Sequence, residues 1–219
     1  MGTRVIGIDE AGRGPVIGPL VIAGVSIGDK MREYFKEIGV KDSKMLSIRR
    51  IFQLAPIIKK HSLYDVIIKS AKEIDDRFSS SKNLNYLELN DMAKIANELK
   101  GEKVIVDSPS ANTEAVRKYL SKLVKDKEII ARNYADRDFI EVGAASIIAK
   151  ATRETEIKKI KELFEYDFGS GYPSDPLTKK FLLVLQSTGK LDEYPYKEYI
   201  RKTWFTIKNL KNVTLDKFI

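Results

Sequence analysis

The sequence has 219 residues, of which 43% are hydrophobic and 32% are charged, a composition typical of a globular protein rather than a disordered one. Cysteine is absent and there is one histidine, so disulfides, thiolate catalysis and cysteine-based metal sites are excluded. Lys and Arg number 39 against 31 acidic residues, and the resulting formal charge of +8 favours a polyanionic partner such as nucleic acid.

No apolar run in the sequence approaches the length of about 18 residues that a membrane-spanning helix needs. The first residues lead directly into a run of β-forming residues rather than into a signal-peptide pattern. We therefore expect a cytoplasmic protein that does not insert into a membrane.

Hydrophobic periodicity and turn residues divide the N-terminal part of the chain into strands and helices. Gly-Pro pairs separate the first two strands, and Ser47 is a suitable helix N-cap. In chain order, we expect a strand at 4–9, a strand at 20–27, a helix at 31–38, a helix at 47–61 and a strand at 63–70. These strands are predicted to be neighbours in a hairpin-like sheet.

Strands and helices alternate in the rest of the chain, which predicts parallel strands added to that sheet. In chain order, we expect a helix at 83–100, a strand at 103–107, a helix at 113–124, a strand at 128–131, a loop at 132–136, and helices at 141–164, 177–188 and 197–210. The composition becomes helical and charged near residue 168. We therefore expect an α/β domain over residues 1–168 and a small helical subdomain over residues 169–219.

Acidic residues stand where three of the predicted strands end, at Asp9, Asp107 and Asp136, with Glu10 beside the first. The ends of neighbouring strands converge on one crevice in a twisted α/β sheet, so acids distant in sequence can meet there. A single acid of this kind is more often a solvated carboxylate or a helix cap. The set of four predicts a site.

Asp9 and Glu10 are adjacent, and adjacent strand residues point to opposite faces of a sheet. They can share one site only if the strand ends or distorts there, which Gly12 and Gly14 would permit. Carboxylates this close repel each other, and either a shared proton or a bound cation relieves the repulsion.

Clustered carboxylates without imidazole or thiolate suit Mg²⁺ or Mn²⁺. Two such ions can activate water on one side of a phosphorus atom and stabilise the leaving oxygen on the other. We therefore predict phosphodiester hydrolysis, with nucleic acid as the substrate of this basic protein.

Four segments together resemble one known family. They are Asp9-Glu10-Ala11-Gly12-Arg13-Gly14-Pro15, Val106-Asp107-Ser108, Asp136 with Ala144-Ala145-Ser146 eight residues further on, and Gly171-Tyr172-Pro173. This set resembles type 2 ribonuclease H, in particular archaeal ribonuclease HII, over essentially the whole chain. The resemblance implies a ribonuclease H-like mixed sheet flanked by helices. It also implies an endonuclease that cuts RNA in RNA–DNA hybrids and cuts 5′ of ribonucleotides embedded in duplex DNA, leaving 3′-hydroxyl and 5′-phosphate ends.

By position, the resemblance implies that the catalytic metal ligands are Asp9, Glu10, Asp107 and Asp136. The spacing to Ala-Ala-Ser selects Asp136 as the fourth acid. Asp138 remains an alternative, because it lies two residues away and would share a strand face with Asp136.

The candidate substrate-binding residues lie in four segments. Gly12, Arg13 and Gly14 resemble a loop that reads the ribose 2′-hydroxyl, a group that distinguishes RNA from DNA. Tyr172 resembles a tyrosine that senses the junction with DNA, and Ser43 with Lys44 resembles a phosphate-binding pair. Ser146 and Lys150 lie four residues apart, so they share a helix face and could meet the substrate backbone.

The C-terminal part of the chain supports weaker expectations. Arg201 and Trp204 fall on the predicted last helix, and we expect Trp204 to pack. The tail at 213–219 has an apolar and aromatic character that suggests binding to a sliding clamp, although it could instead pack on the last helix. We expect a monomer.

Three other functions are compatible with parts of the pattern. Another metal-dependent nuclease of the same fold would lack the ribose-reading loop and would cut all-DNA substrates. A non-catalytic hybrid-binding protein would not need four acids that repel phosphate. Nucleotide binding at Gly12–Gly14 is disfavoured because the glycine spacing is not that of the dinucleotide fingerprint and because acids precede the loop.

Overall fold

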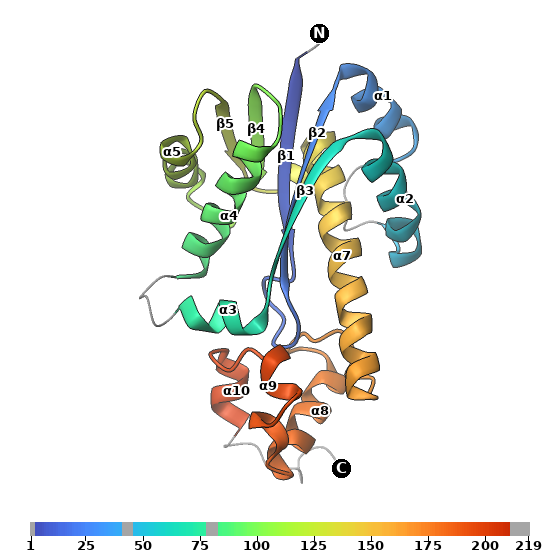
Figure 1. Ribbon diagram of the computed structural model, residues 1–219, viewed down its shortest axis with the longest axis vertical. Helices are drawn as coiled ribbons and strands as arrows, with labels where there is room; N and C mark the ends of the chain where they lie inside the picture. The colour runs from blue at the N-terminus through green and yellow to red at the C-terminus, as the bar shows by residue number, and fades with distance from the viewer. Residues whose placement is uncertain (1–2, 41–45, 78–82, 211–219) are drawn as a thin grey trace. The chain divides into compact units, whose positions relative to one another are not determined.

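The computed structural model describes residues 3–40, 46–77 and 83–210 (Figure 1). Its contacts divide the chain into two compact units. The sheet unit comprises Met1–Ala11, Val21–Ile68 and Lys82–Thr152, and the helical unit comprises Gly12–Leu20, Lys69–Ser81 and Arg153–Ile219. Each unit therefore draws on several stretches of sequence. The predicted division into domains at residue 168 stays a prediction.

The sheet unit is built on a five-stranded sheet with the order β3-β2-β1-β4-β5. Its strands are β1 (Arg4–Ala11), β2 (Leu20–Gly28), β3 (Leu63–Lys69), β4 (Lys103–Asp107) and β5 (Glu128–Arg132). β1 pairs antiparallel with β2 and parallel with β4, and β4 pairs parallel with β5. The predicted mixed sheet, in which parallel strands extend an N-terminal hairpin, is confirmed.

Helices cover both faces of this sheet. Alternate residues of β2 point to opposite sides, and both sets are buried. On one face, Val21, Val25 and Ile27 join a core with side chains of three helices. These helices are α1 (Asp29–Glu37), α2 (Ile48–His61) and the first part of α7 (Ile140–Phe164). Ser47 caps α2 as predicted, since its side chain accepts the N–H of Arg50.

The opposite face of the sheet packs against α4 (Leu84–Glu98). A Cβ atom at Gly24 would lie 2.2 Å from Cγ2 of Ile95 and 3.0 Å from Cδ1 of Leu99, so the absence of a side chain at Gly24 permits this close approach. α5 (Thr113–Leu123) contacts both α4 and β5.

The helical unit has a core of its own. Phe164, Phe168 and Phe181 pack together with ring centroids 5.7–5.8 Å apart. Around them lie α3 (Ala71–Asp76), the last part of α7, α8 (Pro176–Ser187), the 3-10 helix η3 (Lys190–Asp192), α9 (Tyr196–Tyr199) and α10 (Phe205–Asn209).

The long helices and the five strands agree with the sequence, whereas the predicted last helix does not. The helices predicted at 83–100 and 141–164 are α4 and α7. The single helix predicted at 197–210 is wrong, because α9 and α10 are separated at residues 200–204. The separation follows from Ile200, which forms a β-bridge with Ile17 and so leaves the helical conformation.

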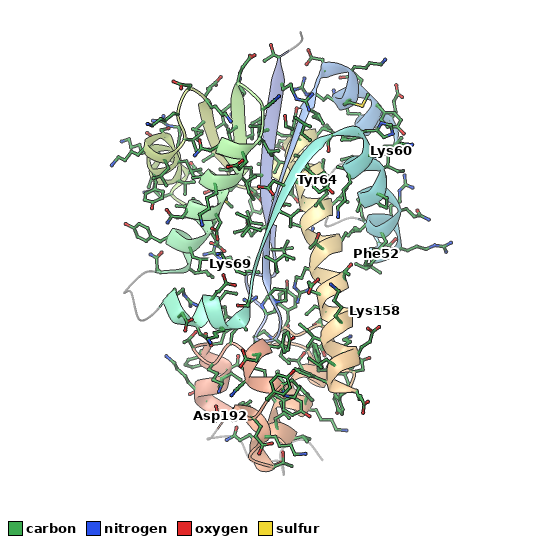
Figure 2. All side chains as sticks on the ribbon, viewed as in Figure 1. Phe52, Lys60, Tyr64, Lys69, Lys158 and Asp192 are labelled. Atoms are coloured by element: carbon green, nitrogen blue, oxygen red, sulfur yellow. The ribbon has the colours of Figure 1, made fainter. Side chains whose placement is uncertain are left out.

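The outer side of α2 and β3 carries exposed aromatic and basic side chains, among them Phe52, Lys60 and Tyr64 (Figure 2). The Lys59 ammonium lies 5.4 Å from the centre of the Tyr64 ring. Within residues 3–40, 46–77 and 83–210, no helix combines the length and apolar character needed to cross a bilayer.

Gly7 gives a test of how tightly β1 packs on α7. A Cβ atom at Gly7 would lie 2.1 Å from the carbonyl carbon of Glu141 and 2.3 Å from the nitrogen of Val142, and backbone atoms cannot rotate away. We expect Gly7→Ala to lower the free energy of unfolding by about 2–3 kcal/mol, measured by urea denaturation. Gly28→Ala is the control, because its nearest neighbour would lie at 3.8 Å; an equal loss in both variants would contradict this account.

Candidate active site

Asp9 and Glu10 lie within β1 and not beyond its end. The register with β2 runs unbroken to Ala11. The strand end or distortion that the sequence led us to expect at the acids is therefore absent from β1. Asp9 is 5% exposed, and Glu10 is half-buried. The last pair with β4 joins Ile8 to Val106, so Asp9 lies level with Asp107, the last residue of β4, and Glu10 lies one residue beyond it.

Asp107 is the last residue of β4, as predicted. Its Oδ1 accepts the backbone N–H of Ala135 at 3.0 Å. Ala135 opens the one-turn helix α6 (Ala135–Asp138), which follows Tyr134 in a left-handed conformation with φ of 60°. The end of β4 is therefore tied to the turn that carries Asp136.

The fourth acid does not stand at a strand end. β5 ends at Arg132, and the last two residues of the loop predicted at 132–136 belong to the short helix α6. The argument that Asp136 and Asp138 share a strand face is wrong, because residues two apart on a helix face different directions. Asp136 is 2% exposed and Asp138 is exposed.

The charges of these acids act on one another. Burial raises the pKa of Asp9 well above its ordinary value, and the nearby carboxylates of Glu10 and Asp107 raise it further. Two hydrogen bonds oppose this effect, one from the Ser146 side chain and one from the backbone N–H of Glu10, which lies 2.7 Å from Oδ1 of Asp9. Asp9 therefore sits in a field of negative charge that spans β1 and β4.

The donor set suits a hard cation. All the side chains concerned offer carboxylate oxygens, and the single imidazole, His61, lies exposed at the end of α2 against Tyr34. Among the residues that the structure describes, no three acids are close enough together to hold an ion as they stand. The carboxylates would have to move closer to bind one ion jointly.

Ser146 is placed by α7 against Asp9 and is 1% exposed. Its hydroxyl thus contacts an acid of the site, a role that the sequence did not suggest. Lys150 lies one turn further along α7 and is half-buried. Ser43 and Lys44 lie outside the described residues.

A cavity of about 320 Å³ adjoins Asp107. It lies where two neighbouring parallel strands, β4 and β5, end, which is where the sequence predicted a crevice, but sequence reasoning singled out Asp107 alone among its lining residues as a site residue. The lining residues are Asp107, Ser108, Pro109, Ser110, Ala111, Asn133 and Tyr134. Hydroxyl and amide groups therefore stand beside the acid.

The predicted ribose-reading loop belongs to the helical unit. Gly12 has a φ of +88°, in the region that favours glycine, and Gly14 is exposed. Tyr172 is 38% exposed, and the guanidinium carbon of Arg153 lies 5.2 Å from the centre of its ring. A Cβ atom at Gly14 would lie 3.5 Å from the Tyr172 ring, so this tyrosine and the loop are neighbours within the helical unit.

Comparison with known proteins identifies the family. The family model described as Ribonuclease HII matches residues 6–206. The chain belongs to the ribonuclease HII family. It is therefore an endonuclease of the ribonuclease H type, and the predicted family and enzyme class are confirmed. The alternative of a non-catalytic hybrid-binding protein is wrong.

Similarity extends over nearly the whole chain. A ribonuclease HII of Methanobrevibacter smithii is 44% identical over 95% of this chain and 98% of its own. The ribonuclease HII in a complex with PCNA from Archaeoglobus fulgidus is 40% identical, with a TM-score of 0.87 over 98% of this chain and all of that chain. Ribonuclease H2 of Pyrococcus horikoshii is 38% identical, with a TM-score of 0.85 over 95% of this chain and 97% of its own. The ribonuclease H fold is thus confirmed.

The raised pKa of Asp9 predicts a conflict between stability and activity. Because the folded-state pKa lies above the unfolded-state value, ionisation of Asp9 opposes folding, and stability falls as pH rises through the interval between the two values. At pH 8 in EDTA we expect Asp9→Asn to raise Tm by about 2–4 °C, or about 1 kcal/mol. Adding Mg²⁺ should raise Tm of the wild type more than that of the variant.

Scanning calorimetry with and without Mg²⁺ measures both effects. Ser146→Ala is the matched control, because it removes a hydrogen bond to Asp9 and leaves the charge in place. It should lower Tm in EDTA. A lower Tm for Asp9→Asn as well would show that the charge of Asp9 does not oppose folding.

Proposed function

We propose that this protein is a metal-dependent nuclease that cuts the RNA strand of RNA–DNA hybrids and cuts 5′ of ribonucleotides embedded in duplex DNA. The observation that carries the metal dependence is the burial of the Asp9 carboxylate beside those of Glu10 and Asp107. Family membership gives the ribonuclease H activity, and the carboxylates supply a place for the metal. The products would carry 3′-hydroxyl and 5′-phosphate ends.

The metal ligands in this proposal are Asp9, Glu10, Asp107 and Asp136, with Mg²⁺ or Mn²⁺ as the cation. When bound, the metal supplies an activated water and stabilises the leaving oxygen. The chain itself orients the acids. Ser146 and the N–H of Glu10 fix the Asp9 carboxylate, and the N–H of Ala135 fixes Asp107. The burial of Asp136 and the exposure of Asp138 support Asp136 as the fourth ligand.

The helical unit would recognise the sugar. In the proposal, Gly12, Arg13 and Gly14 read the 2′-hydroxyl through their backbone, and Tyr172 stacks at the junction with DNA. The exposure of Gly14 and Tyr172 supports both roles. The residues proposed to contact the substrate backbone are Ser43, Lys44 and Lys150. Ser146, which is 1% exposed, is proposed to act on the substrate through Asp9 and not by direct contact. The proposed substrate-binding subdomain is 169–219.

Binding to a sliding clamp is a further part of the proposal. It is supported by the relative that was solved in complex with PCNA and by the apolar tail at 213–219, which lies outside the described residues. We propose that the enzyme itself acts as a monomer.

The substrate is tested with a DNA duplex that contains one ribonucleotide. In Mg²⁺ we expect a single cut on the 5′ side of the ribonucleotide, with the ends identified by ligation and by phosphatase treatment. The same duplex made entirely of DNA should stay intact. Efficient cutting of the all-DNA duplex would instead support a different nuclease of this fold.

The fourth acid is tested by a matched pair of variants. Asp136→Asn should lower the single-turnover rate by at least about 1,000-fold, because it removes a charged ligand from the metal site. Asp138→Asn should change that rate less than about threefold, since Asp138 is exposed one half-turn away on α6. The reverse ranking would assign the role to Asp138.

A further inference from the structure

Arg201 is the largest of the fully buried side chains, with 0% exposure. It follows Ile200, which bridges to Ile17, and its own N–H donates to the carbonyl of Val16 at 2.8 Å. The chain at residues 200–201 is thereby aligned with the segment that follows the predicted ribose-reading loop. All these residues belong to the helical unit.

The Arg201 guanidinium donates to three backbone carbonyls. Its Nη2 lies 2.6 Å from the oxygen of Gly12, its Nη1 lies 3.0 Å from that of Arg13, and its Nε lies 3.0 Å from that of Gly18. The planar guanidinium presents its donors in a fixed geometry. One side chain thus holds both ends of the segment between Gly12 and Gly18.

Trp204 completes the arrangement. Its Nε1–H donates to the carbonyl of Gly14 at 3.1 Å, and its ring lies 4.9 Å from the guanidinium carbon of Arg201. The carbonyls of Gly12, Arg13 and Gly14 therefore all accept hydrogen bonds from residues 201–204. This is a second role for Trp204, in addition to the packing that the sequence predicted.

Burying the Arg201 charge costs free energy, so a gain in stability does not explain why an arginine stands here. Burial, and the nearby Arg153, lower the pKa of Arg201 to about 9, so the group remains a cation at neutral pH but an unfavourable one. A buried charge is weak evidence for stability, because an apolar side chain of similar volume often serves as well. An apolar side chain could not hold three carbonyls.

We propose that Arg201 is a positioning residue for ribose recognition: its guanidinium, with the Trp204 indole, fixes the backbone of Gly12–Gly14 in the shape that accepts a 2′-hydroxyl. The proposal rests on the proposed function of that loop. A loop held in its binding conformation before the substrate arrives loses less entropy on binding. Arg201 therefore affects the preference for a ribonucleotide more than the affinity for DNA.

The test measures ribose preference, defined as the Kd of an all-DNA duplex divided by the Kd of the same duplex with one ribonucleotide. Fluorescence anisotropy with Ca²⁺ in place of Mg²⁺ gives both values. In Arg201→Lys, which keeps the charge and loses the planar fork, we expect this preference to fall about tenfold. The single-turnover rate in Mg²⁺ should fall about 10–100-fold, and the Kd for all-DNA should change less than about twofold.

Trp204→Phe is the second variant, because it removes one hydrogen bond to the loop and keeps an aromatic ring. Its preference should fall in the same direction by about two- to fivefold, and it decides the matter if Arg201→Lys does not fold. The control is Arg32→Lys in the sheet unit, which disturbs a partly buried ion pair with Glu141. It should lower Tm without changing ribose preference.

The outcomes separate this proposal from the function on which it rests. If the wild type does not cut at the ribonucleotide, the proposed function fails. If the wild type cuts there and both variants keep its ribose preference within twofold, Arg201 has only a structural role and the positioning proposal is overturned. A parallel loss of affinity for both duplexes would overturn it as well.

Discussion

Repulsion between partly buried carboxylates is the constraint on which the arrangement of the sheet unit depends. Asp9 is buried beside Glu10 and Asp107, and its pKa is raised by burial and by both neighbours. The fold does not remove this repulsion. Separate elements supply hydrogen bonds to the acids: Ser146 on α7 donates to Asp9, and the N–H of Ala135 on α6 donates to Asp107. The acids are thus oriented while their negative charge is kept.

The apolar core of the sheet unit and the close packing of strand backbone against the helices oppose this repulsion. Gly7 lets β1 approach the backbone of α7, and Gly24 lets β2 approach Ile95 on α4. Gly7 lies on β1, the strand that carries Asp9 and Glu10, and Gly24 lies on its neighbour β2. The parallel pairing of β1 with β4 up to Ile8 keeps the Asp9 carboxylate near Asp107, although the repulsion between them favours separation.

The sequence was a good guide where a signal is local or periodic. The amphipathic helices α4 and α7, the N-cap Ser47 and the mixed sheet all follow from patterns of that kind. The failures have one physical cause, which is that contacts distant in sequence decided the local conformation. Ile17 pairs with Ile200 and interrupts the predicted last helix, and Asp107 binds the N–H of Ala135 at the start of α6.

The same limit applies to the candidate site. Asp9 and Asp107 could be found because each follows a run of β-forming residues, which is visible in sequence. No sequence pattern shows that Arg201 donates to carbonyls almost two hundred residues earlier, since its hydrogen bonds go to backbone atoms and carry no residue-type signal. A positioning residue of this kind can be found only from a structure.

The two units bury charge of opposite sign, and they differ in how that charge is compensated. In the helical unit, the cation Arg201 is satisfied by the carbonyls of Gly12, Arg13 and Gly18, so the chain itself supplies the partners. In the sheet unit, the carboxylates near Asp9 raise one another's energy, and a cation from outside the chain is the natural compensation. In the proposed function, catalysis would then depend on metal concentration, whereas selection of the sugar would depend on contacts within the chain.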